Sequence, residues 1–253
     1  MYNDAGRRFD FARVFQGALA AIGANFATFA LLAVLFGVIP DFLQGLFKIY
    51  AQTSAFTPLP EEELQLGQSS ALGWILWVAF AVLSYVGLYL LQGAVMRGSV
   101  DHLNGRPADF STCLNTGVRF LAPLFGIAVA TGLATMVGLI LLVVPGLFLL
   151  VVWVVAGPVE VMERKGVFGS MARSTDLTRG YRWPIFGALL VYVVVLIVAT
   201  VIVSLLMAAV STALEAVVPW AELVLSAVLQ GVMGLFGAAG AASLYAELRG
   251  LKE

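Results

Sequence analysis

The sequence predicts an all-α fold: a polytopic membrane bundle of six transmembrane helices with short cytoplasmic interfacial helices, formed by residues 1–253 as a single integral membrane domain. Of the 253 residues, 61% are hydrophobic and 11% are charged. Soluble domains carry about 45–50% apolar and about 25% charged residues. The few charges divide the chain into long uncharged intervals, and none of these alternates apolar and polar residues as barrel strands do. Both observations indicate membrane helices.

The lengths of the uncharged intervals give the number of crossings. A transmembrane helix needs about 20 apolar residues at about 1.5 Å each. The interval 120–159 is too long for one crossing and contains the turn dipeptide Pro145-Gly146, so we expect two crossings joined by a hairpin there. The other intervals predict one crossing each: Val14 to Pro40, Leu72 to Met96, about 184–207, and 223–246. The total is six crossings, the first of which is expected to end near Pro40.

The basic residues set the orientation that we expect. Thirteen of the 14 lysine and arginine residues fall on one side of the predicted bundle, and only Lys48 falls on the other. Lys48 shares its side with six of the 15 acidic residues. Cytoplasmic loops carry the excess of lysine and arginine in membrane proteins. The sequence therefore predicts a multi-pass membrane protein with both termini in the cytoplasm.

Aromatic residues recur at a fixed distance around the start of three predicted spans. The three pairs, each 15 residues apart, are Phe11 and Phe26, Phe110 and Phe125, and Phe168 and Trp183. We interpret this spacing as three helix-hairpin repeats, each with an interfacial helix, a span outward and a span back. Such units share one orientation, so an axis along the membrane normal would relate them.

Small residues at four-residue spacing predict close helix contacts. One stripe lies on the third predicted span and a shorter one on the sixth: Ala122, Gly126, Ala130, Ala134 and Gly138, and Gly234, Ala238 and Ala242. Stripes of this kind let a second backbone approach closely in lipid. Packing within the bundle is the interpretation that we prefer, and pairing of two chains is the alternative.

Residues that carry chemistry are scarce. No charged residue falls inside a predicted span, whereas proton relays and ion-coupled carriers usually need one. His102 is the single histidine, which excludes a multi-histidine metal site within one chain. Neither a Gly-x-Ser-x-Gly elbow nor a phosphate-binding glycine loop is present. We therefore expect no enzyme, no cofactor and no metal, and the net charge of −1 argues against a nucleic-acid partner.

The most distinctive stretch runs from Pro145 to Phe186 and contains the candidate site. Glu160 and Arg164 have the spacing of an ion pair on one helix. Arg173, Arg179 and Arg182 add positive charge beside the inner leaflet, where each contributes about 1 kcal/mol of attraction to anionic lipid. We hypothesise that these five residues contact a lipid headgroup or a protein partner. The alternative is a loop that obeys the positive-inside rule and packs under the bundle.

This stretch resembles the membrane domain family of bacterial glycerophosphoryl diester phosphodiesterases and related stand-alone six-helix membrane proteins of unknown function. The resemblance rests on Pro145-Gly146, Trp153, the segments 158–163 and 173–180, Arg182-Trp183 and, loosely, the segment 245–249. It implies a six-helix inner-membrane domain. The phosphodiesterase activity of that family belongs to a separate soluble domain with histidine and carboxylate metal ligands, which this chain lacks, so the resemblance implies no such activity here.

Together these observations predict a non-enzymatic inner-membrane protein that acts as a lipid-interacting or partner-binding scaffold, with membrane lipids, in particular anionic ones, as its expected partners. A permease or channel for a small neutral or amphipathic solute is the alternative. A membrane-bound enzyme that acts on lipids ranks last. A water-accessible cavity through the bundle would favour transport, whereas a packed core with lipid or protein at the cytoplasmic ring would favour the scaffold.

Overall fold

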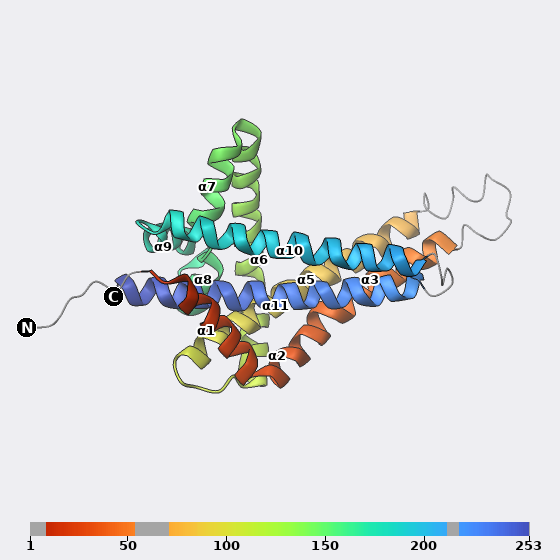
Figure 1. Ribbon diagram of the computed structural model, residues 1–253, viewed down its shortest axis with the longest axis horizontal. Helices are drawn as coiled ribbons and strands as arrows, with labels where there is room; N and C mark the ends of the chain where they lie inside the picture. The colour runs from red at the N-terminus through yellow and green to blue at the C-terminus, as the bar shows by residue number, and fades with distance from the viewer. Residues whose placement is uncertain (1–8, 54–70, 212–217, 253) are drawn as a thin grey trace, which may run out of the picture.

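The computed structural model describes residues 9–53, 71–211 and 218–252, and every regular element in these ranges is a helix (Figure 1). Six segments are long and apolar enough to cross a membrane, as the sequence predicts. They are Phe26–Phe47, Trp74–Leu103, Phe110–Leu141, Val143–Glu163, Arg182–Leu206 and Leu223–Lys252. Some charges used for the orientation lie outside the described residues: Arg7, Arg8, Glu61, Glu62, Glu63 and Glu215.

A separate amphipathic helix, α1 (Phe11–Ala24), precedes the first span. The side chain of Asp10 caps it by accepting a hydrogen bond from the amide of Ala12 at 2.9 Å. One face of α1 is buried against α11 (Val218–Lys252), and Nη2 of Arg13 lies 3.1 Å from Oε1 of Glu247. The buried residues of this face are Val14, Ala18, Ala21 and Ile22. The predicted interfacial helix is therefore present at this position.

The first span bends through a π-helical turn and does not end at Pro40. It consists of α2 (Phe26–Ala33), the π-helix η1 (Val34–Val38) and α3 (Ile39–Thr53). The expectation that the crossing ends near Pro40 is wrong, because the wide turn admits a proline within a continuous helical segment. Proline has no amide hydrogen, so the carbonyl of Phe36 loses its helical donor. Helix α5 (Ala71–Leu103) meets this carbonyl at Gly87, where a Cβ atom would lie 2.4 Å from the oxygen.

Helices α6 (Phe110–Leu141) and α7 (Val143–Trp153) form the predicted hairpin, but the turn is not at Pro145-Gly146. The chain turns at Leu142, the one residue between the helices, whose φ of −161° and ψ of 142° are extended. Proline needs no amide donor in the first turn of a helix, so Pro145 begins α7 well. Gly146 is needed for packing, because a Cβ there would lie 2.8 Å from the amide nitrogen of Leu139.

Two short helices follow the hairpin, α8 (Ala156–Glu163) and α9 (Gly166–Thr178). Gly180 follows Arg179, the C-cap of α9, and has a φ of +94°, which glycine adopts readily. In the loop before α6, Gly105 has a φ of +75°. Asp109 caps α6 by accepting a hydrogen bond from the amide of Thr112 at 2.8 Å.

Helices α5 and α11 lie at the centre of the bundle, and α10 (Arg182–Ser211) runs beside α11 (Figure 1). The start of α1 and the end of α11 lie at the same end of the bundle as α8 and α9. The α6–α7 hairpin stands out to one side and runs across α10 and α11 rather than along them (Figure 1). Its tip is strongly exposed, at 73% for Ile140 and 76% for Val144.

The three predicted repeats do not appear as equivalent units. A break separates an interfacial helix from the next span at Asn25 and at residues 179–181, but α6 runs without a break from Phe110 through Pro123. The second predicted interfacial helix is therefore the first part of α6. Of the predicted small-residue stripe on α6, Gly138 packs against Gly146 within the hairpin, as expected for contacts inside one chain.

Candidate functional site

Glu163, at the end of α8, is the centre of a charged cluster that joins α8, α9 and α11. Its Oε2 lies 3.0 Å from Nζ of Lys165 and 3.3 Å from Nε of Arg173, which α9 supplies. Its Oε1 accepts a hydrogen bond at 3.0 Å from the hydroxyl of Tyr245 on α11. Arg249, one turn further along α11, donates to the same tyrosine oxygen at 3.4 Å. The Glu163 carboxylate therefore contacts side chains of both α9 and α11, and Glu163 and Tyr245 lie 82 residues apart in the sequence.

The predicted ion pair between Glu160 and Arg164 does not form. Glu160 is 4% exposed and accepts a hydrogen bond from the hydroxyl of Ser170 on α9 at 2.6 Å. Arg164 ends α8 in the left-handed conformation, with a φ of 53°, so the helix stops before the two side chains come to lie on one face. Its guanidinium carbon lies 5.9 Å from the centroid of the Phe120 ring on α6.

Hydroxyl groups of α9 supply hydrogen-bond donors at the break between α7 and α8. The carbonyl of Val152 accepts hydrogen bonds from the hydroxyls of Ser174 at 2.8 Å and Thr178 at 3.4 Å. Both hydroxyl residues are fully buried. Because a buried carbonyl without a donor is costly, these bonds favour the docking of α9 at this break. Together with the Glu163 cluster, they make α8 and α9 a packed platform at one end of the bundle.

The structure separates the five residues predicted to form one site. Glu160 and Arg173 belong to the platform, where Arg173 contacts Glu163. Arg164 points to α6, Arg179 is exposed in the turn after α9, and Arg182 lies over the ring of Phe148 on α7 with its guanidinium carbon 4.8 Å from the ring centroid. Glu160 and Glu163 thus have partners inside the platform, whereas the last three arginines lie around its edge. Sequence patterns missed the pairing of Glu163 with Tyr245, since no local spacing indicates it.

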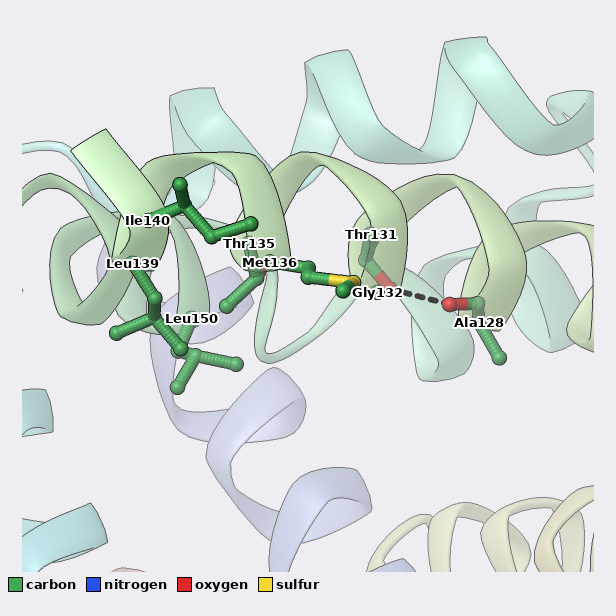
Figure 2. Close-up of a pocket in the computed structure, with 8 residues that line it drawn as sticks. All are labelled: Ala128, Thr131, Gly132, Thr135, Met136, Leu139, Ile140 and Leu150. Carbon is green, nitrogen blue, oxygen red and sulfur yellow. Dashed lines mark hydrogen bonds between the residues drawn. The ribbon is translucent and has the colours of Figure 1, made fainter.

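A groove of about 500 Å³ lies between α6 and α7 in the apolar hairpin (Figure 2). The hydroxyl of Thr131 donates to the carbonyl of Ile127 at 2.7 Å, and its other contact, with the carbonyl of Ala128, is drawn in Figure 2. Thr135, also at the groove, is 6% exposed, and its hydroxyl has no hydrogen-bond partner among the described residues. The groove is lined by two neighbouring helices of the hairpin and not by the centre of the bundle.

Replacement of Thr135 by valine is expected to stabilise the protein by about 1 kcal/mol. The two side chains have the same shape, and the change removes a buried hydroxyl that has no partner. Thermal unfolding in detergent, followed by circular dichroism, measures the effect. Thr131→Val is the matched control on the same helix: it removes a hydroxyl that is hydrogen-bonded, so no gain is expected. A lower melting temperature for Thr135→Val would mean that this hydroxyl has a partner in the folded protein.

In the described part of the chain, no group of three or more histidine, cysteine, aspartate or glutamate residues is placed to hold a metal ion. The polar platform is therefore the candidate site, as a contact surface. No family model, curated protein or solved structure matches this chain. The resemblance to the membrane domain of glycerophosphoryl diester phosphodiesterases accordingly stays a prediction.

Proposed function

We propose that this chain is a non-enzymatic scaffold of the bacterial inner membrane that binds anionic lipid at its cytoplasmic side. In this proposal the platform of α8 and α9 lies at the cytoplasmic surface, which follows from the positive-inside rule applied to 13 of the 14 basic residues. Both termini then lie in the cytoplasm. The six apolar helices hold the platform at the level of the lipid headgroups.

One observation carries the proposal: the carboxylates of Glu160 and Glu163 have partners inside the platform, whereas arginines at its edge have no carboxylate partner among the described residues. Glu160 is buried against Ser170, and Glu163 is surrounded by Lys165, Arg173 and Tyr245. Arg164, Arg179 and Arg182 have no ion pair with an acidic residue in the ranges that the structure describes. Exposed arginines near an anionic leaflet attract its headgroups.

The test compares lipid retention by the wild-type protein and the variant R164Q/R179Q/R182Q. Both are purified in mild detergent, incubated with equal amounts of phosphatidylglycerol and phosphatidylcholine, and analysed by native mass spectrometry. We expect the wild type to retain phosphatidylglycerol preferentially and the variant to lose most of this preference, because three charges at about 1 kcal/mol each are removed. Equal retention by the two proteins would contradict the proposal. A co-purifying protein that the variant loses instead would point to a scaffold that binds a protein partner.

A further inference from the structure

A small polar pocket opens where α5, α6 and the end of α8 meet. It has a volume of about 250 Å³, and arginines from three separate parts of the chain line it: Arg97 of α5, Arg119 of α6 and Arg164 at the end of α8. Asn115 and Ser111, also on α6, add neutral polar groups to its wall. Arg164 is predicted from the sequence to contact a headgroup, whereas no sequence pattern places Arg97 and Arg119 beside it.

Of the three arginines, Arg119 and Arg164 are not neutralised by an acidic side chain in the described part of the chain. Nε of Arg97 lies 2.7 Å from Oδ2 of Asp101, so this pair is neutral. The guanidinium carbons of Arg119 and Arg164 each lie 5.9 Å from the centroid of the Phe120 ring, so they are no farther apart than twice that distance. Neither has an ion pair with an acidic side chain in the described part of the chain. Like charges repel, and an anion bound to both guanidinium groups would offset that repulsion.

Asp109, the capping residue of α6, does not neutralise them. Asp109 accepts hydrogen bonds at 2.8 Å from both the amide and the hydroxyl of Thr112, so its charge faces the start of its own helix. These two bonds also lower the pKa of Asp109. The carboxylates of Asp101 and Asp109 thus each have partners on their own helices, and the positive charge of Arg119 and Arg164 remains in the pocket.

The backbone at Arg164 is a second, independent sign that its side chain has a use here. Arg164 is the one residue other than glycine with a positive φ, 53°, in the ranges that the structure describes. This conformation costs a side-chain-bearing residue about 1–2 kcal/mol, and glycine would avoid the cost. A ligand contact by the side chain, which lies beside the Phe120 ring, would explain why arginine and not glycine occupies this position.

We propose that this pocket binds a phosphate group, with Arg119 and Arg164 as its charged ligands and Asn115 as a further donor. Guanidinium groups bind phosphate oxygens through paired, charge-assisted hydrogen bonds. The phosphate belongs either to an anionic lipid or to a soluble phosphate compound, and the chemistry of recognition is the same for both. The lipid version rests on the function proposed above, because it needs the platform to face the headgroups. The proposed function needs only a general attraction between arginines and anionic headgroups, whereas this pocket is one defined binding site for a phosphate group.

The experiment uses the full chain in nanodiscs of phosphatidylcholine that contain a minor fraction of phosphatidylglycerol, and two variants. R119Q/R164Q removes both charged ligands, while R106Q removes one exposed arginine outside the pocket and serves as the matched control. Native mass spectrometry counts bound phosphatidylglycerol, and a thermal shift with inorganic phosphate tests the soluble source. We expect the wild type to bind one phosphatidylglycerol or to melt at a higher temperature with phosphate. The double variant should weaken that binding at least tenfold, and R106Q should change it less than twofold. Unchanged circular dichroism without ligand shows that R119Q/R164Q is folded.

The outcomes separate the pocket from the function on which it rests. Loss of one bound phosphatidylglycerol in R119Q/R164Q alone supports a lipid phosphate, and loss of the phosphate thermal shift alone supports a soluble one. If R106Q weakens lipid binding as much as R119Q/R164Q, the pocket is wrong and a diffuse lipid-binding surface remains. If the wild type binds neither probe, both proposals are wrong. Wild-type binding by the folded double variant overturns the pocket.

Discussion

Replacement of Gly87 by alanine is expected to destabilise the bundle by about 3 kcal/mol, one of the two largest effects that the structure predicts. The added Cβ would lie 2.4 Å from the carbonyl oxygen of Phe36, closer than side-chain carbons approach any atom in folded proteins. Both groups belong to helical backbones, so a rotamer change cannot relieve the clash. Overpacking typically costs about 1–3 kcal/mol, and a backbone contact falls at the upper end of that range.

Gly240 on α11 is the matched control for this substitution. A Cβ there meets no atom within 4 Å, so Gly240→Ala removes only the flexibility of a helical glycine. It is expected to leave the protein unchanged or to stabilise it by up to about 1 kcal/mol. Thermal and denaturant unfolding in the same detergent give both values. Equal stability of the two variants would show that α5 does not approach Phe36 as closely as the structure indicates.

Glu163→Ala is expected to lower the free energy of unfolding by about 3 kcal/mol. The change removes the shared partner of Lys165, Arg173 and Tyr245, of which Arg173 is partly buried and Tyr245 is 1% exposed. Hydrogen bonds to charged groups contribute about 1.5–3 kcal/mol, and removal of one member of a buried pair costs more than the pair gains. Chemical unfolding, followed by helical circular dichroism, measures the loss.

A double-mutant cycle with Tyr245→Phe isolates one contact of this cluster. The two changes together should cost about 1 kcal/mol less than their sum, because the hydrogen bond between Glu163 and Tyr245 can be lost only once. Asp176→Ala is the control, an exposed acidic residue on α9, and should change stability by less than about 0.5 kcal/mol. Additive effects of Glu163→Ala and Tyr245→Phe would mean that this hydrogen bond contributes nothing.

Features that depend on neighbouring residues could be predicted from the sequence. The six spans follow from the absence of charge over lengths that lipid requires, and the cap at Asp109 and the turns at Gly105 and Gly180 follow from local backbone preferences. Two local rules failed at the hairpin and at α8. Pro145 suits the start of a helix as well as a turn, and the pair of Glu160 and Arg164 assumed that the helix continues to Arg164.

The contacts that define the candidate site could not be predicted, because they join distant segments. Glu163 and Tyr245 come together only when α8 packs on α11. Arg119 and Arg164 lie at the same Phe120 ring only when α8 packs on α6. A pattern of charge along the sequence shows on which side such residues lie. It does not show which arginines find a carboxylate and which do not, and this difference is the basis of both proposals.

The direction of the α6–α7 hairpin has a consequence for the bilayer around this protein. Because the hairpin runs across α10 and α11, no single membrane normal lies along all of these helices (Figure 1). The hairpin ends in an exposed apolar tip at Ile140 and Val144. A bilayer of uniform thickness therefore cannot hold all six apolar helices upright at once.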